Sequence, residues 1–489
     1  MANTQPHDAL AELEGAVWRY FAALAAIPRC SKNERAAGDY VISVAQEHGL
    51  AHSRDDAGNI VVSKPGSGAP AAGPPVVLQA HLDMVCEKNM GTDHDFAKQG
   101  IGLEIADGWL RARGTTLGAD NGIAVAMMLA VLAADIPAPP VECLFTVDEE
   151  SGLIGAQNLD IRMLTGRRLI NLDSEEEGYL SIGCAGGLNT YVTIPVVRQS
   201  AAAGTDRYVL MISGLQGGHS GVNIHEGRGN ALVLAGRALE AALALPGVAL
   251  AEIRGGDKHN AIPRECRIEL SVAAGAEPEL RAAVTRLTGD FRAEHAKIEP
   301  DLAMTLEAAA APSGDNLVYA DEAAQRVVNF LLAVPHGVLG MSEVVPGLVE
   351  TSTNLAAIDR KNGTIEVLTS QRSPQESLIQ WAAAKVTAAA RLAGGDARKA
   401  EHYPGWPPND QSPILAQTVT TYESMYGKAP EVIAVHAGLE CGVIGSKIAG
   451  MDMVSFGPDI LGAHTPEERV SIASTDRTYE FLVALLAQL

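Results

Sequence analysis

The sequence predicts an α/β domain, a doubly wound sheet with helices on its faces, that is interrupted by an inserted α+β domain. Short apolar runs alternate with helix-like stretches over residues 1–186, and the same pattern returns over residues 396–489. This alternation is typical of a sheet with helices packed on its faces. Between these parts, residues 187–395 alternate longer strand-like segments with long helices. We therefore expect one domain that is divided in the sequence by a second.

Three continuous apolar runs in the first part predict strands buried on both faces. They cover residues 76–80, 141–147 and 169–172. Each run is too short to be typical of a helix, although periodicity alone does not separate a buried strand from a buried helix. Residues 122–134 are rich in Ala, Met and Leu and predict a helix. Ser31-Lys32-Asn33-Glu34 has the spacing of a capping box, which indicates the start of another helix.

The inserted part contains alternating, strand-like segments and long Ala- and Leu-rich segments with helical periodicity. Strands are predicted at residues 189–197, 208–213, 267–272, 302–307 and 364–370, and helices at residues 230–244, 277–297, 321–334 and 374–393. After Gly394-Gly395-Asp396 the first pattern returns, with strands predicted near residues 432–435 and 453–456.

Composition narrows the class of protein. The chain has 37 Lys and Arg residues against 59 Asp and Glu residues, a formal net charge of −22. Nucleic acid and anionic membranes attract basic surfaces, so neither is expected as a partner. No apolar run reaches the roughly 18 residues of a membrane-spanning helix. The N-terminal sequence MANTQPHDALAELEG lacks a basic region followed by an apolar stretch, so we expect no secretory signal and a cytoplasmic location.

The cysteines predict neither a disulfide framework nor a cysteine zinc site. Six cysteines are scattered along the chain without CxxC spacing; they are Cys30, Cys86, Cys143, Cys184, Cys266 and Cys441.

Acidic residues and histidines follow the predicted strands or stand in Gly-rich turns. They are His81-Leu82-Asp83, Asp120, Asp148-Glu149-Glu150, Asp173 and His464. Taken singly, each is more typical of a turn or a solvated loop. Ligands of open α/β sheets bind beyond the carboxyl ends of the strands, so we expect the set to share one crevice. Carboxylates gathered there need a compensating proton or cation, and imidazole with carboxylate suits zinc, cobalt or manganese.

The residue types also suggest separate roles. Two histidines and three carboxylates would serve a pair of divalent metals, with Asp120 bridging them. Asp83, two residues after His81, is placed to orient the imidazole. Glu149 and Glu150 are adjacent and point different ways, so one can bind metal while the other handles protons.

A set of segments resembles the aminoacyl-histidine dipeptidases, cytosolic Xaa-His dipeptidases (also called cytosol non-specific dipeptidases) that are related to carnosinases among the dinuclear zinc exopeptidases. In chain order the segments are VVLQAHLDMVCEKN, TTLGADNGIAVA, FTVDEESGLIGA, LINLDSEEEG, LQGGHSGVNIHEGRGNA, HNAIPREC, HAGLECG and GAHTPEERV. The resemblance implies a zinc-exopeptidase-like catalytic domain with a mixed central sheet flanked by helices, formed by residues 1–186 and 396–489. Residues 187–395 would be an inserted α+β lid or dimerisation-type domain.

The resemblance also implies a role for each candidate residue. It implies metal ligands at His81, Asp120, Glu150, Asp173 and His464, with Asp120 bridging two zinc ions. It implies that Asp83 orients His81 and that Glu149 is the general base. His219 in Gly217-Gly218-His219-Ser220 would stabilise the oxyanion, either in its own subunit or in the partner of a homodimer.

Two further residues are candidates for reading the substrate. Arg372 has the fork geometry for a carboxylate, and Asn260 matches a lid asparagine that contacts substrate in relatives. For each residue a purely structural role is expected as much as substrate binding: a surface salt bridge for Arg372 and a plain turn for Asn260. His436 and Glu440 lie near the same motifs and receive no role.

These observations predict a metal-dependent dipeptidase that hydrolyses unblocked dipeptides, including Xaa-His dipeptides and β-alanyl-histidine. One alternative is an N-acyl amino acid amidohydrolase with the same dinuclear centre. Another is a non-catalytic scaffold that binds metal or peptide.

Overall fold

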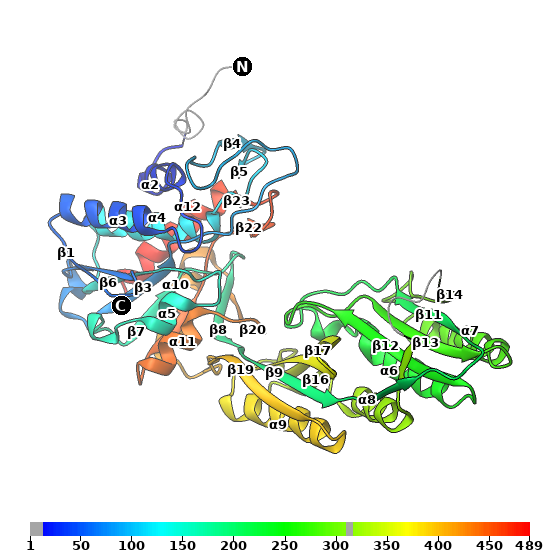
Figure 1. The fold of residues 1–489 in the computed structure, drawn as a ribbon. Helices are drawn as coiled ribbons and strands as arrows, with labels where there is room; N and C mark the ends of the chain where they lie inside the picture. The colour runs from blue at the N-terminus through cyan, green and yellow to red at the C-terminus, as the bar shows by residue number, and fades with distance from the viewer. Residues whose placement is uncertain (1–12, 310–315) are drawn as a thin grey trace. The chain divides into compact units, whose positions relative to one another are not determined.

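The computed structural model describes residues 13–309 and 316–489 and divides into two compact units (Figure 1). Unit 1 comprises Met1–Cys184, Trp406–Ala434 and Leu439–Leu489, and unit 2 comprises Ala185–Gly405 and Val435–Gly438. Most of the segment used for the prediction about a secretory signal, residues 1–12, lies outside the described residues. The domain limits at 186/187 and 395/396 remain predictions.

Unit 1 is built on an eight-stranded mixed sheet in the order β1-β2-β6-β3-β7-β21-β8-β20. Four neighbouring strands run parallel to one another, so their carboxyl ends meet at one edge; they are β6 (Val141–Thr146), β3 (Val76–His81), β7 (Arg168–Asn171) and β21 (Asp452–Ser455). The outer strands include β1 (Ala51–Arg54), β2 (Ile60–Lys64), β8 (Tyr179–Cys184) and β20 (Glu431–Val435). The strands predicted from short apolar runs are therefore confirmed.

Helix α4 (Ala119–Ala133) contacts strand β3 and helix α2 (Ala16–Ala25). Nearly all of its residues are buried, as expected for a helix that is apolar on almost every side. The other helices of the unit are α3 (Arg35–Glu47), α5 (Ile154–Asn158), α10 (Pro413–Tyr426), α11 (Glu440–Lys447) and α12 (Ile472–Leu486).

The predicted capping box before α3 is wrong. Ser31 Oγ donates to Asp83 Oδ2 at 2.8 Å, and Glu34 Oε1 accepts the backbone N–H groups of Lys32 and Asp148. Both side chains are therefore engaged in contacts outside the first turn of the helix.

A second, four-stranded sheet in unit 1 was not predicted. Its order is β22-β23-β5-β4, with strands β22 (Ile460–Leu461), β23 (Arg469–Ser471), β5 (Trp109–Ala112) and β4 (Leu103–Ala106). Strands β22 and β23 flank residues 462–468, so this sheet holds both ends of the loop that carries His464.

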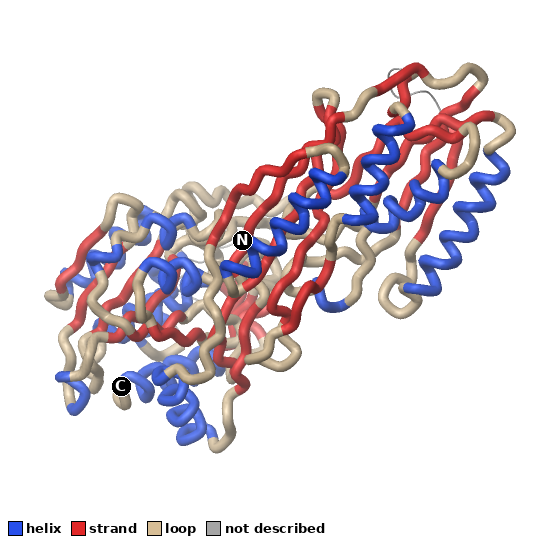
Figure 2. The backbone as a smooth tube through the Cα atoms, turned by 90° about the horizontal axis from the view of Figure 1, so that it is seen from below, coloured by secondary structure: helices blue, strands red, loops and turns tan. Residues whose placement is uncertain are grey.

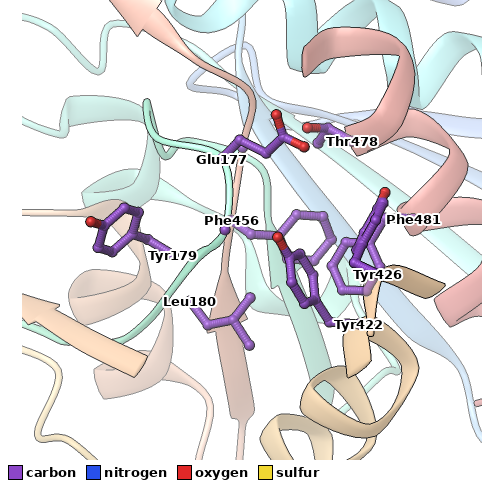
Figure 3. Close-up of a pocket in the computed structure, with 10 residues that line it drawn as sticks. Glu177, Tyr179, Leu180, Tyr422, Tyr426, Phe456, Thr478 and Phe481 are labelled. Carbon is purple, nitrogen blue, oxygen red and sulfur yellow. The ribbon is translucent and has the colours of Figure 1, made fainter. Parts of the chain in front are cut away.

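An aromatic cluster packs the C-terminal helices against the main sheet (Figure 3). The ring of Phe481 on α12 lies 4.9 Å from that of Phe456 and 5.3 Å from that of Tyr422, between ring centroids. Arg477 on α12 also donates to both carboxylate oxygens of Glu177. These contacts fix the segment that follows β7.

Unit 2 is an antiparallel sheet in the order β14-β11-β13-β12-β17-β18-β9-β19, with β16 also paired to β17. Its strands are β9 (Gly186–Pro195), β11 (Thr205–Ser213), β12 (Val248–Gly256), β13 (Cys266–Ala273), β14 (Ala303–Ala308), β16 (Gly337–Met341), β17 (Val349–Lys361), β18 (Thr364–Ser373) and β19 (Asp396–Tyr403). Two short strands, β10 (Arg198–Ser200) and β15 (Leu317–Tyr319), form a separate pair.

Four helices share one hydrophobic core with this sheet (Figure 2). They are α6 (Ala231–Leu243), α7 (Glu277–Glu294), α8 (Asp321–Ala333) and α9 (Glu376–Leu392), and all four agree with the predicted helices. Together the two units confirm an α/β fold with an inserted α+β part.

One pair of cysteines departs from the prediction. Cys30 and Cys86 form a disulfide, whereas Cys143, Cys184, Cys266 and Cys441 are free and buried. The pairing arises because the segment after α2 runs beside the segment after β3, where Cys30 and Met84 form an isolated bridge.

Within residues 13–309 and 316–489, no helix is both long enough and apolar enough to cross a membrane.

Candidate active site

The five predicted metal ligands come together in unit 1 at the carboxyl edge of the parallel strands. His81 ends β3, Asp173 follows β7, and Glu150 follows β6. Asp120 lies at the start of α4 and His464 lies between β22 and β23. Strand β3 and the segments after β6 and β7 thus supply three of the side chains, and the start of α4 and the β22–β23 loop supply the other two.

Asp120 is shared between two groups of potential ligands. Its Oδ1 lies 3.1 Å from His81 Nε2, which is also 3.6 Å from Asp173 Oδ1. Its Oδ2 lies 3.0 Å from His464 Nε2, which is also 3.1 Å from Glu150 Oε1. In each group the candidate ligand atoms lie within 4.8 Å of one another. This arrangement has the form of two metal positions with one bridging carboxylate.

The residue after Asp120 supports the same arrangement. Asn121 Nδ2 donates to Asp173 Oδ1 at 2.7 Å, and the Asp120–Asn121 peptide bond is cis. The amide of Asn121 therefore holds the Asp173 carboxylate.

The electrostatics of this cluster favour a bound cation. Hydrogen bonds that His464 donates to the carboxylates of Asp120 and Glu150 raise the pKa of His464 to about 11. Burial opposes the charge of His81, but Asp173 and Asp120 outweigh it and raise its pKa well above the usual value. Burial also raises the pKa of Asp173 and Glu150, because like charges and desolvation disfavour their ionised forms. Imidazole nitrogens and carboxylate oxygens are the donors that zinc accepts, so these residues fit a metal.

Asp83 and Glu149 lie directly beside the ligand groups. Asp83 Oδ1 is 3.3 Å from His81 Nδ1 and accepts the backbone N–H of Glu149 at 3.0 Å. Burial of Asp83 is outweighed by its contacts with His81, which lower its pKa to about 2. Burial raises the pKa of the Glu149 carboxyl well above its usual range. A carboxylate oxygen of Glu149 lies within 4.8 Å of ligand atoms of His81 and Glu150.

His219 belongs to unit 2 and has a defined tautomer. Its Nδ1 accepts the backbone N–H groups of Gly221 and Val222 at 3.2 and 3.1 Å. The ring is neutral under these bonds and carries its proton on Nε2. Burial, followed by the charge of Arg372, lowers the pKa of His219 to about 4.

Arg372 and Asn260 also belong to unit 2 and differ in exposure. Arg372 on β18 is only 5% exposed, and its Nη1 donates to the hydroxyl of Tyr403 at 3.1 Å. Among residues 13–309 and 316–489, no carboxylate forms a salt bridge with Arg372 and its Nε has no hydrogen-bond partner. The alternative expectation for Arg372, a surface salt bridge, is therefore wrong. Asn260 is exposed, and its backbone carbonyl accepts the N–H of Ser220, as in the turn alternative.

Several buried polar residues near the site were not assigned from the sequence. Arg29 and Glu468 contact the backbone around Asp120, and Glu440 accepts from Gln79 and Thr146 at 2.6 Å each. Burial raises the pKa of Glu440 to about 7. Glu468 stands in GAHTPEERV close to His464, which is a usable signal, whereas nothing in the sequence distinguishes Arg29 from a surface arginine.

Known proteins resemble this chain over nearly its whole length. It is 38% identical over 474 residues to a cytosol non-specific dipeptidase of Escherichia coli (strain K12), covering 97% of each chain. The crystal structure of an aminoacylhistidine dipeptidase from Vibrio alginolyticus matches with a TM-score of 0.89 and 40% identity, covering 99% of this chain and 98% of that one. An aminopeptidase PepT from Bacillus cereus, at 17% identity and a TM-score of 0.55, shares the fold. The model of peptidase family M20/M25/M40 matches residues 77–488, and the chain belongs to this family.

Proposed function

We propose that this protein is a metal-dependent dipeptidase that hydrolyses unblocked dipeptides, including Xaa-His dipeptides and β-alanyl-histidine. The position of Asp120 between two groups of ligands, with Glu149 beside them, is the observation that carries the proposal. The names of the bacterial relatives, a cytosol non-specific dipeptidase and an aminoacylhistidine dipeptidase, support this substrate class and a cytoplasmic location.

We propose that His81, Asp120 and Asp173 hold one divalent ion, and that Asp120, Glu150 and His464 hold another. Two such ions, zinc or alternatively cobalt or manganese, would polarise the scissile carbonyl and make a shared water more acidic. Asp83 would keep the His81 ring in place through Nδ1, as carboxylates behind metal-bound histidines do.

Glu149 is the proposed general base. Its half-buried carboxyl lies beside the ligands and its pKa is raised, so it can accept a proton from the attacking water and later donate it to the leaving amine. The backbone N–H of Glu149 donates to Asp83, and this hydrogen bond fixes the backbone position from which the Glu149 side chain extends.

His219 is the proposed donor to the developing oxyanion. Because its Nδ1 is occupied by two backbone N–H groups, Nε2 presents a hydrogen from a neutral ring. A neutral donor can stabilise negative charge without first exchanging a proton with solvent.

Arg372 is the proposed reader of the free carboxylate of the substrate. None of the carboxylates in the described part of the chain pairs with this buried guanidinium, so its donors are available for a bidentate anion. Asn260 would contact the substrate from its exposed turn, and residues 187–395 would act as a lid. An N-acyl amino acid also carries a free carboxylate, so the amidohydrolase alternative shares this subsite and differs at the amino end.

The test is hydrolysis of unblocked dipeptides and of N-acyl amino acids by the purified protein loaded with zinc, cobalt or manganese. We expect cleavage of unblocked substrates, loss of activity after thorough demetallation, and recovery when metal is restored. Activity that survives demetallation would contradict the proposal. A preference for N-acylated substrates would support the amidohydrolase, and absence of hydrolysis with metal bound would support the scaffold.

A further inference from the structure

Two buried charged side chains from distant parts of unit 1 bind the turn that carries Asp120. This turn comprises residues 117–120 and leads into helix α4. Glu468 and Arg29 are each only 2% exposed. Arg29 lies after helix α2, and Glu468 lies in the same loop as His464.

Glu468 binds the turn through backbone N–H groups. Its Oε2 accepts from Leu117 at 2.7 Å and from Gly118 at 3.0 Å, and its Oε1 accepts from Asp120 at 3.2 Å. Because Glu468 and His464 share one loop, the Glu468 carboxylate ties the loop that carries His464 to the backbone of Asp120. His464 in turn reaches Asp120 Oδ2.

Arg29 binds the same turn through carbonyl groups. Its Nη2 donates to Gly118 O, while its Nη1 donates to Leu82 O at 3.0 Å and Asp83 O at 3.1 Å. The guanidinium therefore joins the Asp120 turn to the segment that follows His81.

Gly118 is bound from both sides, at its N–H by Glu468 and at its carbonyl by Arg29. It has a φ of +69°, and a Cβ added there would lie 2.5 Å from Arg29 Nη2. Only glycine fits this position without displacing the arginine. The close approach indicates that the turn is shaped around these two side chains.

We propose that Arg29 and Glu468 are positioning residues that hold both ligand groups in place before metal binds. The inference rests on the proposed ligand set. Fixing the turn from both sides keeps the Asp120 carboxylate between His81 and His464, and each of these histidines is linked to the turn by one of the two charged residues. Partners of this kind typically change metal affinity by about 10–100-fold when they are removed.

Unit 1 offers a matched control for Glu468. Glu142 is a second buried carboxylate that binds backbone N–H groups, and it lies away from the proposed ligands. Glu142 accepts the N–H groups of Thr165 and Gly166, with Oε2 at 3.0 Å from each nitrogen. It lies near the start of β6, at the opposite end of the strand from Glu150. Glu142→Gln and Glu468→Gln therefore remove the same charge from the same kind of contact.

The experiment is titration of the metal-free protein with Co²⁺, followed by visible absorption and calorimetry. We expect Glu468→Gln to weaken Co²⁺ binding by about 10–100-fold and to change the absorption band. Glu142→Gln should lower the melting temperature while leaving Co²⁺ affinity and spectrum as in the unmodified protein. Arg29→Lys should also weaken binding, because an ammonium group cannot reproduce the planar fork that spans three carbonyls.

A ligand variant separates failure of this inference from failure of the proposed function. If Asp120→Ala loses Co²⁺ binding while Glu468→Gln and Arg29→Lys bind as the unmodified protein does, the positioning role is overturned and the ligand set stands. If Asp120→Ala binds normally, the ligand set itself is wrong. Equal losses in Glu468→Gln and Glu142→Gln would also overturn the positioning role. Should Glu468→Gln fail to fold, Arg29→Lys decides, since unchanged affinity contradicts the inference and weakened affinity supports it.

Discussion

The histidines at the candidate metal ligands of unit 1 and three histidines of unit 2 stand in opposite electrostatic surroundings. In unit 1, His81 and His464 face carboxylates, and their pKa values are raised. In unit 2, burial lowers the pKa of His219 and His336 to about 4 and that of His436 to about 3, with Arg372 adding to the effect on His219 and His436. The same side chain therefore favours its charged form at the ligand groups of unit 1 and its neutral form at these three positions of unit 2.

This contrast indicates what each unit can bind. Unit 1 gathers more carboxylates than imidazoles around Asp120, and a cation compensates such an excess. Unit 2 gathers neutral histidines near a buried arginine, which suits an anionic or electron-rich group. We therefore expect metal binding to depend on unit 1, and recognition of the substrate carboxylate and the oxyanion to depend on unit 2.

The largest expected effect separates catalysis from metal binding within unit 1. Glu149→Ala should lower kcat by about 10²–10⁴-fold, because it removes the group that transfers protons. Metal content, measured by mass spectrometry, should not change. Glu176→Ala, at an exposed position in the segment after β7, is the control and should keep full activity. Normal turnover by Glu149→Ala would contradict the role of this residue as a base.

A change in unit 2 tests whether that unit takes part in the reaction. His219→Ala should lower kcat by about 10²–10³-fold with unchanged metal content, because it removes a donor to the oxyanion. The exposed His225 provides a control histidine in the same segment. Mixing inactive His219→Ala and Glu149→Ala proteins distinguishes the two sources of the histidine, because activity returns only if His219 acts on a partner subunit. A kcat equal to that of the unmodified protein would remove His219 from the mechanism.

Arg372 gives a smaller effect that should fall on substrate binding. Arg372→Lys should raise KM for unblocked dipeptides by roughly 10–100-fold, as expected for losing hydrogen bonds to a charged group. For dipeptides with a C-terminal amide, the variant and the unmodified protein should have similar KM values. Equal losses for both substrates would mean that Arg372 does not read the carboxylate.

The smallest effect follows from the lowered pKa values in unit 2. An unfolded histidine takes up a proton near pH 6.5, whereas folded His336 resists protonation until about pH 4. The stability that its neutral form contributes is therefore fully present above pH 6.5 and is lost as the pH falls towards 4. Between pH 7 and pH 5 this amounts to about 1–2 kcal/mol. Denaturant unfolding of His336→Gln should show a correspondingly flatter pH dependence, and an unchanged slope would contradict the assignment.

The sequence was sufficient to predict the features that depend on local patterns. Strands β3, β6 and β7 are short apolar runs, and the candidate ligands after them are polar residues placed where such runs end. Strand β17 was missed because it buries Thr351, Thr353 and Asn354, so it shows no alternation of apolar and polar residues. Thr351 and Thr353 contact Ser373 and Gln371 of β18. Asn354 Nδ2 donates to the carbonyls of His259 and Ala261, and a local pattern reveals none of these partners.

The remaining omissions depend on contacts between distant segments. The Cys30–Cys86 disulfide and the contacts of Arg29 exist because the segment after α2 runs beside the segment after β3. Ser31 and Glu34 matched a capping box in spacing, but Asp83 and Asp148 provide their partners in the folded chain. A pattern in sequence therefore identified the residue types at the site more readily than the residues that hold them.

Anomalous X-ray diffraction from crystals of the zinc-loaded protein tests the central claim most directly. We predict two zinc peaks on either side of the Asp120 carboxylate, one contacted by His81 and Asp173 and the other by His464 and Glu150. Zinc bound away from Asp120, or a single peak without contact to either histidine, would contradict the account.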